Sequence, residues 1–207
     1  MAASLFRKGR TVSLKPLEMG HAPILKNWLN DPELTQFMSR SMPVTEYEQF
    51  ASISYMIKSK DHFAFVIDID QDKTIGVASV YEISWPHRRG KIGIVLGERN
   101  HWGQGIAGEA TMLLLDFVFN SLDLFAVAAT ALSNHEHAIS TNVHAGFVEV
   151  GRIPKWIRGQ NGERLDEITF LMTQEAWRPL WDEYRSTGKA FVTARPARRR
   201  TLRSAAL

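Results

Sequence analysis

The feature that most constrains the fold is an apolar run followed by a glycine-rich turn and an amphipathic segment, in residues 91–121 (KIGIVLGERNHWGQGIAGEATMLLLDFVFNS). The run at 92–96 has the length and branched side chains of a buried strand. After a polar turn, three glycines occur within six residues: Gly103, Gly105 and Gly108. Apolar residues then recur with helical spacing at Ile106, Ala110, Leu113, Leu114 and Phe117. We therefore predict a strand, a glycine-rich turn and a helix that faces a core.

Such a unit is suited to bind an anion. The first N–H groups of a helix have no partner within the helix, and the helix dipole places roughly half a positive charge there. Glycines let the backbone approach a bulky anion, because they carry no Cβ atom. We predict that this turn binds the pyrophosphate of a cofactor.

The string GQGIAG also fits G-x-G-x-x-G, the dinucleotide fingerprint of nicotinamide-dependent oxidoreductases. That fingerprint follows its strand almost directly, and an acidic residue ends the next strand. Here five polar or aromatic residues intervene, and the next predicted strand, 125–132, ends without Asp or Glu. The context therefore disfavours the oxidoreductase.

The segment WGQGIA at 102–107, continued by Gly-Glu-Ala, resembles the acetyl-coenzyme A motif of the GNAT N-acetyltransferase superfamily. The resemblance is closest to the RimJ/RimL-type branch and to bacterial spermidine acetyltransferases. Four further segments match that branch in the same order: WLNDPE at 28–33, HRR at 87–89, AGF at 145–147 and 162–166. The resemblance spans about residues 10–175.

The resemblance implies a single α+β domain, residues 1–186, with a twisted, mostly antiparallel sheet of about seven strands and helices on both faces. Hydrophobic periodicity predicts strands at 11–18, 62–69, 74–83, 92–96, 125–132, 147–152 and 164–173, and helices at 22–30, 45–58, 106–117, 135–145 and 175–186. Residues 187–207 carry six of the lysines and arginines and no acid, which leaves −3 of the net charge of +3 on residues 1–186. We expect this basic tail to be flexible. It is the only segment with enough positive charge to contact nucleic acid or a membrane surface.

The amino-acid composition excludes several kinds of site and segment. The chain has no cysteine, which excludes disulfides, thiolate metal sites and a cysteine nucleophile. No apolar run reaches the 18 or so residues of a membrane span, and the start lacks the apolar core of a signal peptide. We therefore expect a cytoplasmic protein.

The function that the resemblance implies is direct transfer of the acetyl group of acetyl-CoA onto a primary amine, without a metal. The acceptor could be a protein N-terminus, a polyamine or an amino sugar. A homodimer is common in the branch. A non-catalytic acyl-CoA-binding module is the alternative, because the tyrosine that protonates the leaving thiolate in many relatives is replaced by Asn142.

The resemblance also assigns residues. Backbone amides at Val95, Leu96 and Gly97 would polarise the thioester carbonyl, and Asn134 and Asn142 would bind the pantetheine arm. The phosphates would be bound by the motif itself: Trp102, Gly103, Gln104, Gly105, Ile106, Ala107 and Gly108.

Catalytic side chains are assigned less directly. Glu82 is the first candidate for the base and Glu98 the second, while Ser140 is the remaining candidate donor to the thiolate. Trp28, Trp85 and Asp166 are candidates for acceptor binding, although Trp28 also fits a packing role. Three histidines at 135, 137 and 144 lack the H-E-x-x-H spacing of a zinc site, so we predict no metal.

Overall fold

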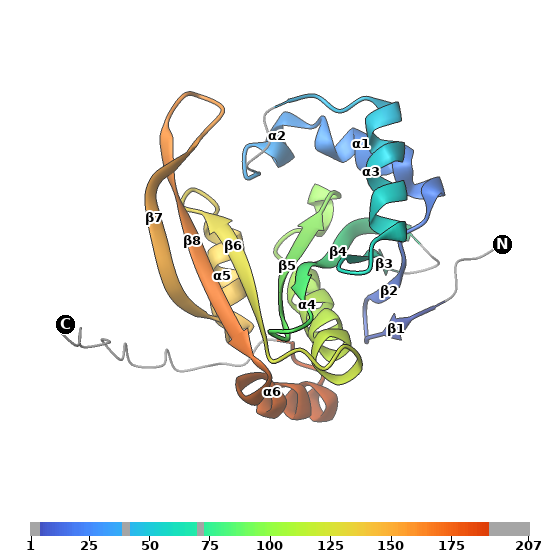
Figure 1. Cartoon of the computed structure of the whole chain (residues 1–207), viewed down its shortest axis with the longest axis vertical. Helices are drawn as coiled ribbons and strands as arrows, with labels where there is room; N and C mark the ends of the chain where they lie inside the picture. Colours follow the sequence, from blue (N-terminus) through green and yellow to red (C-terminus); the bar gives the residue numbers. More distant parts are fainter. Residues whose placement is uncertain (1–4, 39–41, 70–72, 191–207) are drawn as a thin grey trace.

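The computed structural model describes residues 5–38, 42–69 and 73–190, and its centre is an eight-stranded sheet (Figure 1). The sheet order is β1-β2-β3-β4-β5-β6-β8-β7. Neighbouring strands are antiparallel except β5 and β6, which are parallel. The strands are β1 (Arg7–Lys8), β2 (Ser13–Pro16), β3 (Phe63–Ile69), β4 (Lys73–Ser84), β5 (Arg89–Leu96), β6 (Ala126–Leu132), β7 (Val148–Arg158) and β8 (Arg164–Thr173). The predicted α+β class is confirmed, and the strand beyond the predicted seven is the two-residue β1.

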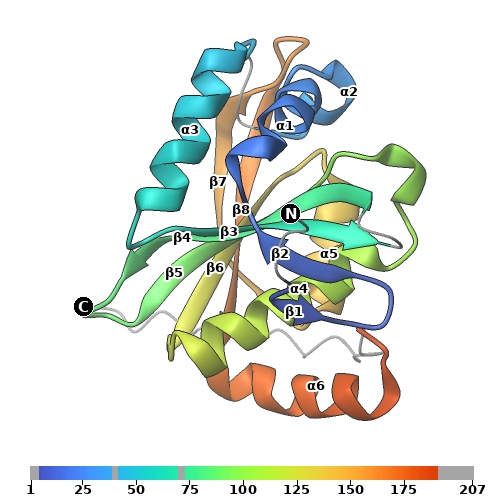
Figure 2. The same cartoon turned by 90° about the vertical axis from the view of Figure 1, so that its right-hand side faces the viewer.

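Helices cover both faces of the sheet, as predicted (Figure 2). α1 and α3 lie on one face, and α4 and α5 lie on the other. The helices are η1 (Met19–His21), α1 (Ala22–Leu29), α2 (Pro32–Thr35), α3 (Glu46–Lys58), η2 (Arg99–His101), α4 (Ile106–Asp116), η3 (Phe117–Ser121), α5 (Glu136–His144) and α6 (Gln174–Thr187).

Because both faces are covered, the central strands carry apolar residues on both sides. In β3, Phe65 and Ile67 pack toward α4, whereas Val66 packs toward α1 and α3. Trp28 and Ile53 complete the second of these cores. The sheet is therefore buried between two apolar layers, which explains why β3 is a nearly continuous apolar run.

Local signals in the sequence set several helix ends. α3 begins with the predicted capping box, in which Thr45 Oγ1 accepts from Glu48 N at 3.2 Å and Glu48 Oε2 accepts from Thr45 N at 2.8 Å. α5 is followed by Gly146 in the left-handed region, at φ 90°. A side chain there would also collide with Leu180 of α6.

Two strands extend three or more residues beyond their predicted bounds. β5 begins at Arg89 rather than at residue 92, because a bulge in β4 lets Ser84 pair with Arg89 and shortens the connecting turn to 85–88. Glu82 lies in that bulge with a φ of 50°. β7 continues to Arg158 instead of ending at residue 152, through an irregular stretch in which Lys155 has a φ of 55°. Both extensions depend on bulges, which hydrophobic alternation does not reveal.

A buried carboxylate joins three elements on the α4 face. Glu109, in the first turn of α4, accepts hydrogen bonds from the backbone amides of Arg10 and Thr11, from the Thr11 hydroxyl and from the Tyr184 hydroxyl. These contacts hold the β1–β2 turn and α6 against α4. The Glu of the Gly-Glu-Ala string therefore has a structural role.

The described part of the chain ends shortly after the C-terminal helix, α6. α6 ends at Thr187, Gly188 caps it at φ 72°, and Ala190 packs against the core. Most of the predicted basic tail, residues 191–207, lies outside the described residues.

Candidate functional site

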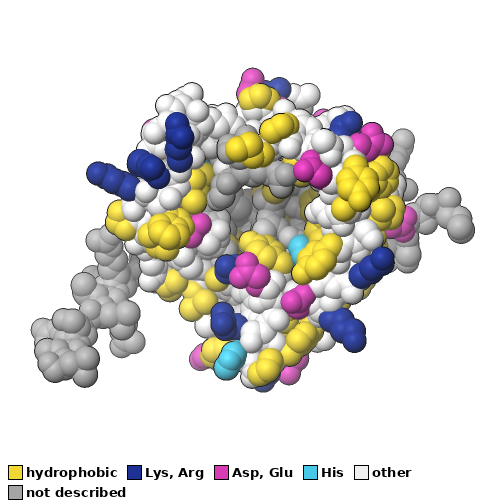
Figure 3. Space-filling model, turned by 45° about the horizontal axis from the view of Figure 1, so that its top comes forward, with side chains coloured by type: hydrophobic (Ala, Val, Ile, Leu, Met, Phe, Trp, Pro, Cys, Tyr) yellow, Lys and Arg dark blue, Asp and Glu magenta, His cyan; other side chains and the backbone are white. Residues whose placement is uncertain are grey.

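The central strands β5 and β6 separate along most of their length. They pair only over Arg89–Lys91 and Ala126–Ala128, and beyond these residues no pairing joins them in the part of the chain that the structure describes. A cleft with a volume of about 710 Å³ opens there, and Figure 3 shows the molecule hollowed between its two halves. Its walls are the unpaired ends of β5 and β6, the start of α4, and α5.

The unpaired edge of β5 offers backbone groups to this cleft. N–H groups along a strand alternate in direction, and Gly97 N points toward β4, where it donates to Ile75 O at 2.9 Å. By that alternation the amides of Leu96 and Ile94 point into the cleft. The Leu96 carbonyl also faces it, because it accepts from Trp102 Nε1 at 3.0 Å.

The predicted role of the Gly97 amide is therefore wrong, since that amide is already bonded within the sheet. Gly97 is needed for another reason. A Cβ atom at this position would lie 2.0 Å from Cδ2 of Trp28, so the indole occupies the space of a side chain. Val95 and Leu96 both line the cleft. By the same alternation the Val95 amide points toward β4, so of the three predicted amides only that of Leu96 faces the cleft.

The predicted anion-binding turn has the expected backbone. Gly103 and Gly105 both adopt left-handed conformations, at φ 73° and 79°, and Gly105 is the N-cap of α4. The amides of Ile106, Ala107 and Gly108 start α4 and so have no acceptor within the helix. A Cβ built on Gly103 meets nothing within 4 Å, so the space in front of the turn is open. This backbone fits the pyrophosphate of coenzyme A.

Within this turn, the side chains of the motif have different positions. Trp102, Ile106 and Ala107 line the cleft together with the two left-handed glycines. The Gln104 side chain instead donates to Asn100 O at 2.7 Å, which braces the turn. Gln104 and Gly108 are not among the residues that line the cleft.

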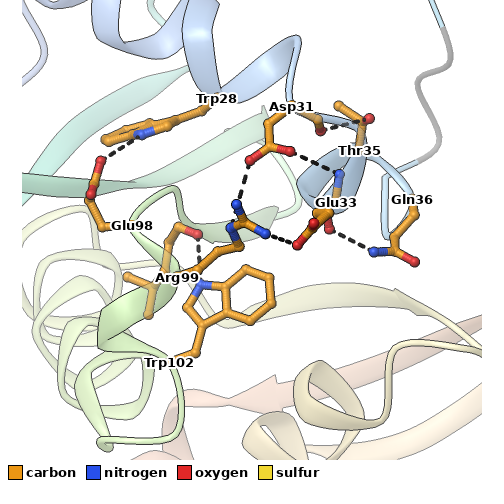
Figure 4. Close-up of polar contacts among 9 residues, drawn as sticks. Trp28, Asp31, Glu33, Thr35, Gln36, Glu98, Arg99 and Trp102 are labelled. Carbon is orange, nitrogen blue, oxygen red and sulfur yellow. Dashed lines mark hydrogen bonds and ion pairs between the residues drawn. The ribbon is translucent and has the colours of Figure 1, made fainter.

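The turn is tied to the helices of the opposite face (Figure 4). Trp28 of α1 donates from Nε1 to Glu98 Oε1 at 3.1 Å. Arg99 forms ion pairs with Glu33 and, at 3.8 Å, with Asp31. Asp31 also caps α2 by accepting from Glu33 N at 2.9 Å. The β5–α4 turn and the α1–α2 segment are thus one connected unit.

The segment that follows α2 crosses the cleft. Phe37 stacks on His135 with ring centroids 4.3 Å apart, and its edge meets Trp102 at 6.3 Å. Gln160, from the β7–β8 loop, donates to Thr35 Oγ1 at 2.9 Å. Burial, with a smaller effect of His137, lowers the pKa of His135 to about 4, so its imidazole is neutral at pH 7.

The three predicted carboxylates are all outside the cleft lining. Glu82 is exposed and pairs with Lys91 at 2.7 Å. Glu98 is bonded to Trp28, as described above. A hydrogen bond from Lys155 N and the guanidinium of Arg152 lower the pKa of Asp166, and these contacts hold it at the β7–β8 pair.

The remaining predicted side chains divide between the cleft and the surface. Ser140 and Asn142 of α5 line the cleft, and Ser140 Oγ lies 3.1 Å from His144 Nδ1. Asn134 is exposed and lies outside the lining. Trp85 is 44% exposed in the β4–β5 turn, where it donates to Lys60 O, and Trp28 is a buried packing residue.

Several residues that were not predicted as site residues reach the cleft from distant elements. Tyr81 of β4, Phe37 and Thr130 of β6 all line it. His135 also lines it, although its only sequence signal was as a candidate metal ligand. No local motif marks these residues, because sheet register and chain crossing bring them together.

Two negative findings apply to residues 5–38, 42–69 and 73–190. No group of three or more His, Asp or Glu side chains is arranged to hold a metal ion. No helix there has both the length and the apolar character needed to cross a membrane.

Comparisons with known proteins agree with this geometry. Residues 11–148 match the model of the acetyltransferase (GNAT) domain family. The chain is 32% identical over 172 residues to the uncharacterised N-acetyltransferase p20 of Bacillus licheniformis, covering 80% of this chain and 94% of that protein. It is 25% identical over 157 residues to the spermidine N(1)-acetyltransferase of Escherichia coli K12, covering 69% and 76%. The Vibrio cholerae spermidine N-acetyltransferase, solved with CoA and spermine, has the same fold, with a TM-score of 0.76 at 22% identity over 81% of this chain and 98% of that one.

Proposed function

The chain belongs to the GNAT acetyltransferase family, and we propose that the acetyl-CoA-dependent N-acetylation it performs uses a cationic primary amine, of the polyamine type, as acceptor. The main structural support for acetyl transfer is the cleft between β5 and β6, which reaches the start of α4 at one end. One cleft can then hold the phosphates, the pantetheine arm and the thioester in a line.

Coenzyme A fits the residues present. The amides of the α4 start would bind the pyrophosphate, and the unpaired amides of Ile94 and Leu96 would bind the pantetheine arm and the thioester carbonyl. The bound molecule supplies the activated acetyl group. The chain itself supplies positioning, since holding two reactants side by side lowers the barrier by removing the cost of bringing them together.

The preference for a cationic acceptor rests on charge near the closed end of the cleft. Glu82 pairs with Lys91 at 2.7 Å at this end, and the Glu167 carboxylate favours the protonated forms of both Tyr81 and Lys91. The relatives that act on spermidine point to the same class of acceptor. Neither carboxylate contacts the cleft directly, so we propose that deprotonation of the ammonium proceeds through water.

A panel of acceptors tests this proposal. Release of free CoA thiol from acetyl-CoA is measured with spermidine, a peptide with a free N-terminus and glucosamine at equal concentrations. We expect the largest kcat/KM with spermidine, and a preference for the peptide or the sugar would contradict the acceptor class. Binding without turnover on any amine would favour the non-catalytic acyl-CoA module, which the comparisons do not support.

We also propose that the chain self-associates through β7. This strand is the edge of the sheet, and its apolar side chains Val148, Val150, Ile153 and Trp156 are 44–61% exposed. Exposed apolar edges favour pairing with another chain. A related Vibrio cholerae enzyme of the same fold is a dodecamer. Light scattering after gel filtration should give a mass above that of one chain, and Trp156→Lys should lower it.

A further inference from the structure

The side chain of Tyr81 lies at the closed end of the cleft. Tyr81 faces Lys91 across the β4–β5 pair, and Lys91 is the last residue of β5 that pairs with β6. Tyr81 also belongs to the cleft lining, unlike its neighbour Glu82 in the β4 bulge. Its phenol is therefore at the point where the two central strands separate.

The ring is held in place from two sides. A Cβ atom built on Gly93 of β5 would lie 3.5 Å from Cε1 of Tyr81, so the ring packs over a position that carries no side chain. On the other side, the His62 ring lies 5.7 Å away between centroids. This packing fixes the ring, which lines the cleft.

The phenol hydroxyl is available as a donor. No residue in the described part of the chain forms a hydrogen bond with it, whereas three other donors in the lining are occupied. Trp102 Nε1 is bonded to Leu96 O, and Thr111 Oγ1 is bonded to Ala107 O at 2.7 Å. Ser140, the predicted donor, shares its hydroxyl with His144.

The charges around Tyr81 suit a group that gives up a proton and takes it back. Burial is the largest effect and raises the pKa of Tyr81, so the phenol keeps its proton at neutral pH. The Lys91 ammonium acts in the opposite direction, because it favours the phenolate, while Glu82 and Glu167 raise the pKa further. A neutral phenol beside an ammonium can therefore donate a proton and be stabilised briefly as the anion.

We propose that Tyr81 is the catalytic residue that protonates the departing thiolate, in place of the tyrosine that Asn142 replaces on α5. This inference rests on the proposed function. The nitrogen lone pair of the amine forms the new N–C bond, and the C–S bond breaks with its electron pair on sulfur. The proton of Tyr81 Oη passes to that sulfur, and the phenolate accepts a proton from the nitrogen. The products are the N-acetylated amine and CoA thiol, and Tyr81 is restored.

The first test compares Tyr81→Phe with Tyr55→Phe, whose ring is 68% exposed on α3. We expect Tyr81→Phe to lower kcat by a factor of about 10²–10⁴, the range typical of general acid catalysis. KM for acetyl-CoA and the rise in melting temperature that acetyl-CoA causes should stay near wild-type values. Tyr55→Phe should match the wild type in every measurement. A Tyr81→Phe variant that binds acetyl-CoA and keeps the wild-type kcat overturns the proposal, whereas a wild type that acetylates no amine overturns the proposed function instead.

The second test uses the wild-type chain and needs no turnover. The chain has four tyrosines, so a spectroscopic titration of phenolate absorbance can resolve a single shifted group. We expect CoA to change the pKa of one tyrosine, and desulfo-CoA, which lacks the sulfur, to leave that pKa closer to its value in the free protein. Identical titrations with both ligands would contradict contact between a tyrosine and the sulfur.

Discussion

The indole of Trp28 covers Gly97 and donates a hydrogen bond from Nε1 to Glu98 Oε1 at 3.1 Å. A helix on one face of the sheet thus fixes the residues with which the anion-binding turn begins on the other face. The contact leaves no space for a side chain at residue 97. It explains why a tryptophan that the sequence suggested as an acceptor contact is buried, with 6% exposure.

Gly97→Ala should destabilise the fold. The new methyl group would overlap the Trp28 ring, and overpacking of this kind typically costs about 1–3 kcal/mol. Chemical denaturation measures the effect. Gly151→Ala is the matched control, because a Cβ on Gly151 of β7 meets nothing within 4 Å and should change the free energy of unfolding by less than about 0.5 kcal/mol. Equal stability of the two variants would contradict the packing described here.

Gly105→Val should remove cofactor binding. The left-handed backbone at φ 79° strains any β-branched residue by about 1–2 kcal/mol, and the strain would displace the first amides of α4. We expect acetyl-CoA to raise the melting temperature of the wild type, by mass action, but not that of the variant. Gly162→Val controls for strain alone, since Gly162 has a φ of 86° in the β7–β8 loop and does not line the cleft. It should lose similar stability but keep the cofactor-induced rise.

The predictions for Gly103 and Gly105 and those for the candidate catalytic carboxylates had different outcomes, and the difference shows which features of the site can be predicted from sequence. Gly103 and Gly105 were predicted from spacing alone, because strand, turn and helix are contiguous and their chemistry is local. Glu82 was predicted from its place at a strand end, but the bulge and its positive φ turn it to the surface, where Lys91 pairs with it. Bulges depend on the pairing of whole strands, so this outcome could not be predicted locally.

Tyr81 and Phe37 are residues of the cleft that local sequence patterns could not predict. Each reaches the cleft through contacts between segments that are far apart in the sequence, and neither belongs to a motif. The fold class was predictable because periodicity repeats along the chain, and seven of the eight strands follow from it. The residues that line the cleft were not predictable, apart from the turn, Val95 and Leu96 of β5, and the two residues of α5.

His135 predicts a pH dependence of stability. Burial lowers the pKa of His135 from 6.5 to about 4 in the folded chain. Between these values the unfolded state binds a proton that the folded state does not, so stability should fall as pH decreases from 6.5 to 4. His135→Gln should remove this part of the dependence, as measured by the free energy of unfolding at several pH values. Parallel curves for wild type and variant over that range would contradict the burial of His135 beneath Phe37.

Tyr184 predicts a loss of stability at alkaline pH. Its hydroxyl donates to the buried Glu109 at 2.8 Å, and burial followed by this bond raises its pKa. The folded chain therefore holds a proton that the unfolded chain releases near its ordinary value of about 10, so this contribution is complete below that pH and is lost as pH rises above it. Tyr184→Phe should cost about 1.5–3 kcal/mol at neutral pH, the range for a hydrogen bond to a charged group. The variant should also lose less stability than the wild type between pH 9 and 11. Tyr47→Phe, at an 82% exposed position of α3, should change neither quantity.

A crystal structure with bound CoA would show whether the cleft between β5 and β6 is the cofactor site. We expect the pyrophosphate to accept hydrogen bonds from the amides of residues 105–108 and the pantetheine arm to lie along the unpaired edge of β5. The sulfur should lie within hydrogen-bond distance of the Tyr81 hydroxyl. CoA bound elsewhere, or β5 and β6 closed into continuous pairing beyond Lys91 with the cofactor present, would contradict it.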